Sequence, residues 1–244
     1  MTYCLAVTVQ KGLVFVSDSR TNAGVDQISI YSKMHRFGRE RERQLVLLSA
    51  GNLATSQSVV ARLQRDLRDE AEPNLHSVSD LHEAADYVGS VSRGQQSKLT
   101  GGGSTFEASF ILGGQIGTEP PAIMLVYPEG NHVTATSESK YGKPILDRIV
   151  ATTTSLEHAA LCALVSMDST LRSNVTVGPP IELLVYHRDS LTPSDYLRLD
   201  NDSAYLRELK SSWEQGLREA FHRLPPIHWG HSGARPVEGR SASG

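Results

Sequence analysis

Short apolar runs, broken by turn residues, mark the first third of the chain as strand-rich. Runs over residues 3–10 and 13–18 flank a Lys-Gly pair whose turn chemistry predicts a tight hairpin. A third apolar run, over residues 44–50, is too short for a buried helix and is followed by Gly-Asn, so it predicts a third strand. Between the second and third strands we expect a loop that carries Lys33, and we interpret the charged stretch 39–43 as a solvated turn without function.

The next segments change to helical spacing. Apolar residues three to four positions apart predict amphipathic helices over 53–71 and from about 80 to 99. Asp80 followed by Glu83 is a helix-start signal for the second of them. We expect the two helices to cover one face of a sheet.

The second half of the chain repeats this order of strands and then helices. Proline and glycine separate the predicted elements, and a Thr154–Glu157 capping box is expected to start the longer of two central helices. The predicted elements are strands at 106–113, 121–127 and 131–136, helices at 142–150 and 155–172, a strand at 181–186 and a helix at 203–223.

Strands and helices therefore occur in separate runs joined by hairpins, which favours the α+β class with antiparallel sheets. Two sheets packed face to face, with a helix pair on each outer side, would bury every apolar face. The pattern thus predicts a four-layer αββα sandwich. We expect a single domain over residues 1–224 and a flexible tail over 225–244, because that last stretch is rich in Gly, Pro and Ser.

Composition limits the kinds of partner and the cellular compartment that we expect for this chain. The chain has 244 residues, 39% of them hydrophobic, and a net charge of −3, so no basic surplus indicates nucleic acid. No apolar run approaches the roughly 18–20 residues that span a bilayer, and the N-terminus lacks the features of a signal peptide. Cys4 and Cys162 fit a reducing compartment better than a disulfide framework. We expect a cytoplasmic protein with no membrane partner.

Metal and cofactor sites are not indicated. None of the nine histidines forms a helical His-x-x-x-His pair, and His228 and His231 have no cysteine or carboxylate at ligand spacing. The glycine-rich stretch 100–104 lacks the Gly-Lys-Ser/Thr ending of a phosphate loop, so we interpret it as a connector. We therefore expect neither a cofactor nor a metal.

Thr2 is the first candidate for catalysis, because it follows Met1 and opens the first predicted strand. Removal of Met1 would expose a threonine whose hydroxyl attacks and whose α-amine, with an ordinary pKa of about 7.7–8.0, accepts the proton. Threonine is small enough for an ordinary aminopeptidase to remove Met1, so we expect no propeptide. By itself, threonine at position 2 is too common to indicate function.

Three further residues supply what an N-terminal nucleophile needs. Lys33 would place positive charge beside the amine and hydroxyl, and Asp18 at the end of the second strand would hold the lysine by a charge-assisted hydrogen bond. Gly51, just past the third strand, would offer an N–H donor to an oxyanion. Each alone has an ordinary explanation, a surface ion pair or a turn. Together with Thr2 they predict one hydrolytic site.

This series resembles the proteasome β-subunits. The residues that carry the resemblance are Thr2, then Ser17-Asp18-Ser19-Arg20, Lys33 and Ser49-Ala50-Gly51-Asn52. Residues 17–26, 32–35, 139–147 and 166–174 are more similar still to the bacterial Anbu type, the ancestral β-subunit. The resemblance covers nearly the whole chain up to about Pro225.

The resemblance implies an Ntn-hydrolase fold with Thr2 as nucleophile, Asp18 and Lys33 as its activating pair and Gly51 as the oxyanion donor. It also implies a multi-subunit assembly, a ring or a helical stack of copies of this chain.

The resemblance implies further groups around the α-amine. Asp168, with Ser169 or Ser173, would orient the amine, and Ser139 or Ser137 would lie beside it. Two departures affect this region. The chain has Thr-Ser-Glu-Ser over 136–139 where proteasome subunits carry Gly-Ser-Gly, and its interval from Asp18 to Lys33 is one residue shorter.

Two functions remain open at this point. The first is a threonine hydrolase that cleaves a peptide, or a non-peptide amide, through Thr2. The second is an assembly or scaffold protein that keeps the fold and has little turnover. The sequence leaves the natural substrate, the number of subunits and any partner ATPase open.

Overall fold

Two five-stranded antiparallel sheets form the centre of the molecule. The computed structural model describes residues 2–22, 28–99, 106–135, 137–138, 143–192 and 195–227. The first sheet has the order β10-β1-β2-β11-β12, with β1 (Cys4–Val9), β2 (Gly12–Asp18), β10 (Ser137–Glu138), β11 (Ile181–His187) and β12 (Asp195–Leu199). The second has the order β5-β6-β7-β8-β9, with β5 (Met34–Arg39), β6 (Arg43–Gly51), β7 (Ala108–Ile116), β8 (Ala122–Val126) and β9 (His132–Ala135). A small hairpin pairs β3 (Arg20–Asn22) with β4 (Ile28–Ile30).

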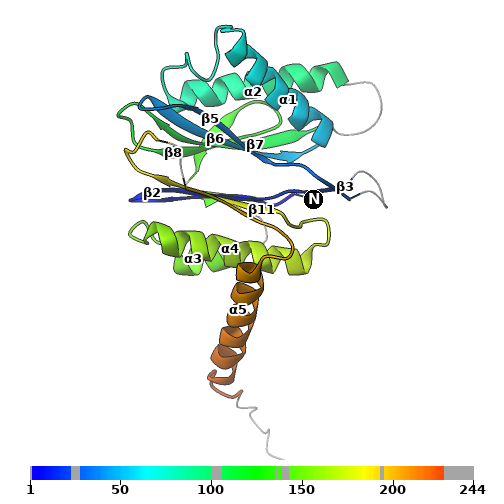
Figure 1. Ribbon diagram of the computed structural model, residues 1–244, viewed down its shortest axis with the longest axis vertical. Helices are drawn as coiled ribbons and strands as arrows, with labels where there is room; N and C mark the ends of the chain where they lie inside the picture. The colour runs from blue at the N-terminus through cyan, green and yellow to red at the C-terminus, as the bar shows by residue number, and fades with distance from the viewer. Residues whose placement is uncertain are drawn as a thin grey trace, which may run out of the picture.

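Helices lie on the outer faces of both sheets (Figure 1). Figure 1 shows α1 and α2 over the sheet that contains β5, β6 and β7, and α3 and α4 beneath the sheet that contains β2 and β11. The bounds of the helices are α1 (Leu53–Arg68), α2 (Leu81–Leu99), α3 (Lys143–Ile149), α4 (Leu156–Ser173) and α5 (Ala204–His222). The predicted α+β class with antiparallel sheets is confirmed.

Side-chain alternation along the strands explains these layers. In β1 and β2, Leu5 and Val14 pack with α4, whereas Ala6 and Phe15 face the other sheet. In β6, Leu47 packs with α1 and α2, whereas Leu48 faces the first sheet. Because successive side chains point to opposite faces, a strand covered on both sides is apolar in sequence. Three apolar clusters result, one between the sheets and one beneath each helix layer.

Helix caps place the ends of the helices close to where the sequence predicts them. Asn52 caps α1 by accepting from Thr55 N–H at 3.1 Å. The signal before α2 also forms, since Asp80 Oδ1 accepts from Glu83 N–H at 2.8 Å. The predicted start of α4 is wrong by one residue, because Ser155 is its N-cap and Thr154 instead accepts from Ala151 N–H.

The segment between β2 and β6 differs from the predicted loop. It contains the β3–β4 hairpin and the edge strand β5, and Lys33 directly precedes β5. Within the charged stretch 39–43, Arg43 is buried and donates to the carbonyls of Leu75 and Val78. Residue 43 is therefore a structural group inside the protein and not part of a solvated turn.

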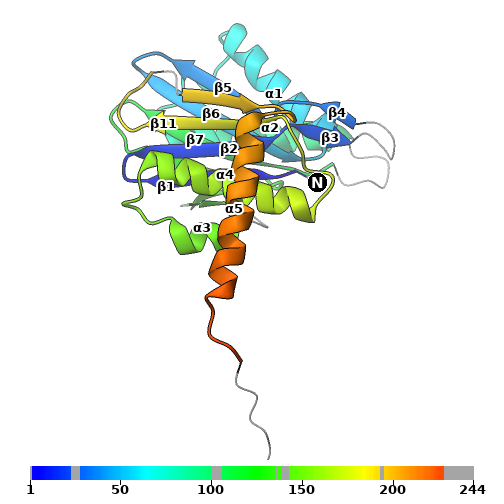
Figure 2. The same ribbon diagram turned by 60° about the horizontal axis from the view of Figure 1, so that its bottom comes forward.

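Helix α5 projects away from the two sheets (Figures 1 and 2). Leu206 and Leu209 near its start pack against the apolar cluster beneath the first sheet, whereas Phe221 near its end is 73% exposed. None of the helices in the described part of the chain combines the length and hydropathy that a membrane span requires. The glycine-rich stretch 100–104 lies outside the described residues, as does the predicted tail beyond residue 227.

Candidate active site

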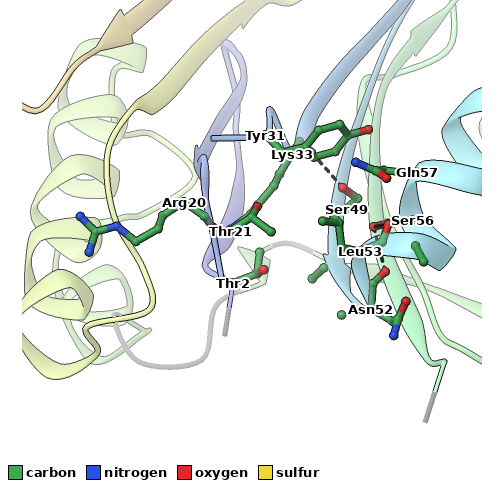
Figure 3. A pocket seen from close by; sticks show the side chains of 13 residues that line it. Thr2, Arg20, Thr21, Tyr31, Lys33, Ser49, Asn52, Leu53, Ser56 and Gln57 are labelled. Carbon is green, nitrogen blue, oxygen red and sulfur yellow. Dashed lines mark hydrogen bonds between the residues drawn. The ribbon is translucent and has the colours of Figure 1, made fainter. Parts of the chain in front are cut away.

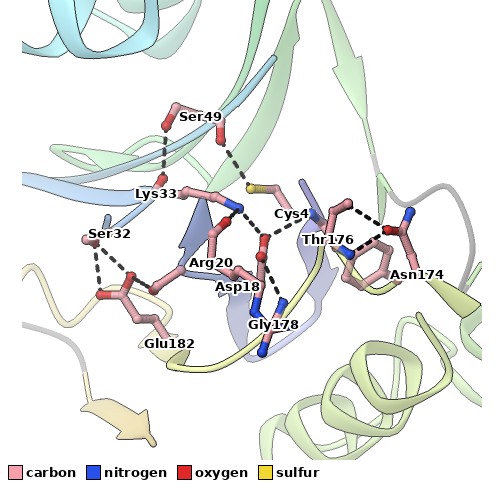
Figure 4. Close-up of polar contacts among 12 residues, drawn as sticks. Cys4, Asp18, Arg20, Ser32, Lys33, Ser49, Asn174, Thr176, Gly178 and Glu182 are labelled. Carbon is pink, nitrogen blue, oxygen red and sulfur yellow. Dashed lines mark hydrogen bonds and ion pairs between the residues drawn. The ribbon is translucent and has the colours of Figure 1, made fainter. Parts of the chain in front are cut away.

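A buried ion pair lies at the start of β1. Lys33 Nζ is 2.6 Å from Asp18 Oδ1, and the two residues are 5% and 0% exposed. The same carboxylate oxygen accepts from Tyr3 N–H at 3.0 Å, while Asp18 Oδ2 accepts from Gly178 N–H at 3.2 Å. Figure 4 shows these contacts converging on Asp18.

Strand pairing brings Asp18 to the N-terminus. β1 and β2 are antiparallel, with Cys4 opposite Ser17, and Asp18 N–H donates to the Tyr3 carbonyl. The carboxylate therefore lies against the peptide that joins Thr2 to Tyr3. Lys33 comes from the other sheet, where its carbonyl accepts from Ser49 N–H at 2.9 Å. The ion pair thus joins the two sheets beside Thr2.

Burial and hydrogen bonding act on Asp18 in opposite directions. Burial raises the pKa of the Asp18 carboxyl above its usual value, and the Lys33 ammonium and the two backbone N–H groups oppose that rise. All three partners are donors, so the ionised carboxylate is the form that this environment satisfies. Lys33 also donates to the Arg20 carbonyl at 2.8 Å, which holds the ammonium from a second side.

A cavity of about 500 Å³ opens at this point. Thr2, Lys33 and Gly51 line it, so three of the four residues in the predicted series share one cavity. Asp18 lies behind Lys33, within the protein. Figure 3 shows Thr2 and Lys33 on one side of the cavity and the start of α1 on the other. The remaining walls combine polar side chains, such as Tyr31 and Gln57, with small apolar ones.

Gly51 has a backbone conformation that residues with a side chain rarely adopt. Its φ is +101°, which favours glycine. Asn52 N–H donates to the carbonyl of Glu107, which directly precedes β7, and Ser49 N–H donates to the Lys33 carbonyl on the opposite side. Because N–H directions alternate along an antiparallel strand, the Gly51 N–H is directed to the Lys33 side, where the cavity lies.

We expect Gly51→Ala to slow any acylation of Thr2 by about tenfold or more and to destabilise the fold by more than about 1 kcal/mol. A Cβ at this position would contact the Glu107 carbonyl oxygen, so the backbone that carries the N–H must move. Gly117→Ala is the control, since Gly117 also has positive φ (+54°) but nothing within 4 Å of a Cβ. Urea denaturation of both variants measures the loss of stability, and the rate at which a β-lactone acylates Thr2 in each measures the loss of reactivity. Equal labelling by the two would contradict the role of Gly51.

The structure does not bring Asp168 to the cavity. Its carboxylate lies 3.4 Å from Arg172 and 3.5 Å from Lys210, between α4 and α5. Ser169 and Ser173 donate to carbonyls of their own helix, Val165 and Ser169 respectively. These three residues of α4 are absent from the cavity lining. Ser139, and the side chain of Ser137, lie outside the described residues.

The loop between α4 and β11 occupies the place beside Asp18 instead. Gly178 donates to the carboxylate, and its carbonyl accepts from Arg20 N–H at 3.2 Å. Asn174 Oδ1 accepts from Thr176 N–H at 3.0 Å and from its hydroxyl at 2.6 Å, which fixes the turn. Figure 4 shows Asn174 and Thr176 near Asp18. Asn-x-Thr directly after a helix is turn chemistry that could have indicated this loop from the sequence.

Cys4 is close to the site but is not a competing nucleophile. Its thiol donates to the Ser49 carbonyl at 3.5 Å, and burial raises its pKa to about 12. A thiol with that pKa remains protonated at neutral pH.

Within the described residues, no group of three or more His, Cys, Asp or Glu side chains has the arrangement of a metal site.

His35 on β5 gives the region a specific pH response. Burial lowers the pKa of His35 to about 4, and the charge of Glu182 opposes this. The unfolded chain binds the proton near the ordinary pKa of about 6.5, so the fold loses stability as the pH falls from that value towards 4.

We expect the free energy of unfolding to fall by about 2–3 kcal/mol between about pH 7.5 and pH 4.5 because of this residue. Urea denaturation of the wild type and His35→Gln at both pH values measures the difference. His158→Gln is the control, because this side chain is exposed. A pH response in His35→Gln equal to that of the wild type would contradict the assignment.

Solved structures similar to this chain cover nearly all of it. Anbu (ancestral beta-subunit) from Yersinia bercovieri is 43% identical, with a TM-score of 0.88, over 93% of this chain and 99% of that one. A structure described as the helical assembly of the Anbu complex from Pseudomonas aeruginosa is 44% identical, with a TM-score of 0.89, over 94% and 99%. Anbu from Hyphomicrobium sp. strain MC1 is 40% identical, with a TM-score of 0.85, over 93% and 100%. No family model and no curated protein matches the chain.

Proposed function

This chain belongs to the Anbu family of ancestral β-subunits, and from that premise we propose that it is an N-terminal threonine hydrolase. Thr2, exposed by removal of Met1, would be the nucleophile. The substrate would be a peptide, or another amide that fits the cavity beside Thr2.

One observation carries this proposal. Asp18 Oδ1 accepts both from Lys33 Nζ at 2.6 Å and from Tyr3 N–H at 3.0 Å. A single buried oxygen therefore holds the ammonium next to the residue that follows Thr2. Positive charge at this place favours the neutral α-amine and the deprotonated hydroxyl, which are the forms that react.

The reaction would proceed in two steps. The Thr2 hydroxyl attacks the carbonyl carbon while its proton passes to the α-amine, and the Gly51 N–H donates to the oxyanion. The tetrahedral intermediate collapses, the proton moves to the leaving nitrogen, and the amine product departs from an ester on Thr2. Water, deprotonated by the same α-amine, then hydrolyses that ester and restores the free threonine.

The proposal includes a fold and an assembly. Sheets packed face to face, each with helices on its outer side, support a four-layer αββα sandwich of the Ntn-hydrolase type over residues 1–224. The helical assembly of the Pseudomonas aeruginosa protein supports an assembly of several copies of this chain. The two free cysteines, Cys4 and Cys162, support a cytoplasmic location.

The same helical relative supports a second candidate, an assembly protein with little turnover. Intact-mass measurement separates the two. We expect the purified protein to lack the mass of Met1 and to gain the mass of one acyl group per chain after reaction with a β-lactone. Retained Met1, or an unmodified protein, would overturn the hydrolase and leave the assembly protein.

A further inference from the structure

A second buried carboxylate, that of Glu182, lies near the Asp18–Lys33 ion pair. Glu182 is 5% exposed and comes from β11. The remaining five residues of the stretch 181–186 are all apolar or aromatic. Its neighbours on the same face of the strand, Leu184 and Tyr186, fill the layer between the sheets. Glu182 thus occupies an apolar row at the end that is closest to Asp18.

Three hydroxyl groups surround this carboxylate. Ser19 Oγ donates to Oε2 at 3.0 Å, Ser32 Oγ lies 2.8 Å from Oε2 and 3.0 Å from Oε1, and Tyr196 Oη donates to Oε1 at 2.6 Å. Each hydroxyl lies against a carboxylate, and hydrogen bonds to an ionised acceptor are about twice as strong as neutral ones; the Tyr196 contact has the short length typical of them. Figure 4 shows Glu182 and Ser32 on the side of Lys33 away from Gly178.

Two of these hydroxyls belong to residues that are adjacent in sequence to the ion pair. Ser19 directly follows Asp18, and Ser32 directly precedes Lys33. Ser19 directly follows β2 of the first sheet, whereas Ser32 lies two residues before β5 of the second. One carboxylate therefore ties together the two backbone segments that carry the ion pair.

We infer that Glu182 is a positioning residue for the reaction proposed above, and the inference rests on that proposed function. It holds the segments of Asp18 and Lys33 at the separation that gives the 2.6 Å contact beside Thr2. Glu182 is not part of the cavity lining and does not contact substrate there. Its removal acts through Lys33 and slows the reaction without weakening substrate binding.

The test measures the rate of β-lactone acylation of Thr2 at saturation and the half-saturating concentration separately. We expect Glu182→Ala to lower the saturated rate about 10- to 100-fold, with half-saturation changed less than about twofold because the cavity keeps its lining. Glu182→Gln keeps an acceptor and an amide donor for the serine hydroxyls. We expect it to stay within about threefold of the wild type.

Asp66→Ala is the matched control for lost stability. Asp66 is also 5% exposed and also accepts from a tyrosine hydroxyl, that of Tyr87 at 2.7 Å, but it lies on α1 and is absent from the cavity lining. The Asp66→Ala variant should lose stability as Glu182→Ala does, but it should keep the wild-type acylation rate. An equal loss of rate in the two variants, a wild-type rate in Glu182→Ala, or no recovery in Glu182→Gln would each overturn the inference.

Crystal structures of the Glu182 variants give an independent readout. We expect the Lys33 Nζ to Asp18 Oδ1 separation to exceed 4 Å in Glu182→Ala and to remain near its present value in Glu182→Gln. An unchanged separation in Glu182→Ala would overturn the inference. If the wild type is not acylated, the proposed hydrolase fails, and these distances alone decide the role of Glu182.

Discussion

Replacement of Thr2 by alanine is expected to abolish covalent modification by a β-lactone, a loss of at least about 1,000-fold in rate. The variant lacks the only hydroxyl that the proposed mechanism uses, and the α-amine alone cannot form the ester. Alanine is small, as threonine is, so removal of Met1 should proceed in both proteins. Intact-mass spectrometry after reaction measures the loss directly.

Thr2→Ser is the matched control for this variant. Serine keeps a hydroxyl and an α-amine on one residue, so we expect modification to continue at a reduced rate. Tyr3 and the residues after it are the same in all three proteins, and the pairing of β1 with β2 should be kept. Modification of Thr2→Ala at the wild-type rate would show that another residue is the nucleophile.

Lys33→Met is expected to abolish β-lactone modification as completely as Thr2→Ala does. It should also destabilise the protein by about 3–5 kcal/mol. Methionine approximately fills the space of the lysine stem, but it leaves the fully buried Asp18 carboxylate without a cation. Modification should be lost because the Lys33 ammonium, which lines the cavity with Thr2, is no longer present to favour the reactive forms of the amine and hydroxyl. Urea denaturation and labelling rates give the two quantities separately.

The double variant Asp18→Asn, Lys33→Met separates catalysis from stability. With no buried charge left at this place, most of the lost stability should return, because the penalty comes from the uncompensated carboxylate. Modification should still be absent. Normal labelling of a folded double variant would mean that Asp18 and Lys33 are only a structural pair.

Elements buried on both faces were predictable from the sequence. The strand at 44–50 contains an apolar run over residues 45–48, because these residues alternately fill two different cores. The edge strands β5 and β12 were missed for the opposite reason. β12 is exposed over four of its five residues, and β5 over half of its length. Neither carries an apolar run or a regular alternation that would distinguish a strand from a loop.

Some residues of the candidate site were likewise predictable from the sequence, and others were not. Thr2, Lys33 and Gly51 stand at or next to strand ends, and the packing of the two sheets brings these ends together around one cavity. Asp168 lies on α4, which is buried on several faces, so helical spacing could not show which of its faces meets the site. Glu182 could have been found, since it is the only charged residue in an otherwise apolar run.

The hydrogen bonds between Asp18 and Tyr3 have a practical consequence for purification. They hold the chain from Tyr3 onward, and none of them requires a free amine at Thr2. An affinity tag joined in front of Thr2 should therefore leave a protein that folds, assembles and crystallises normally while its α-amine is blocked. Inactivity of such a preparation would say nothing about the native protein. A tag placed after the last residue of the chain leaves the threonine free.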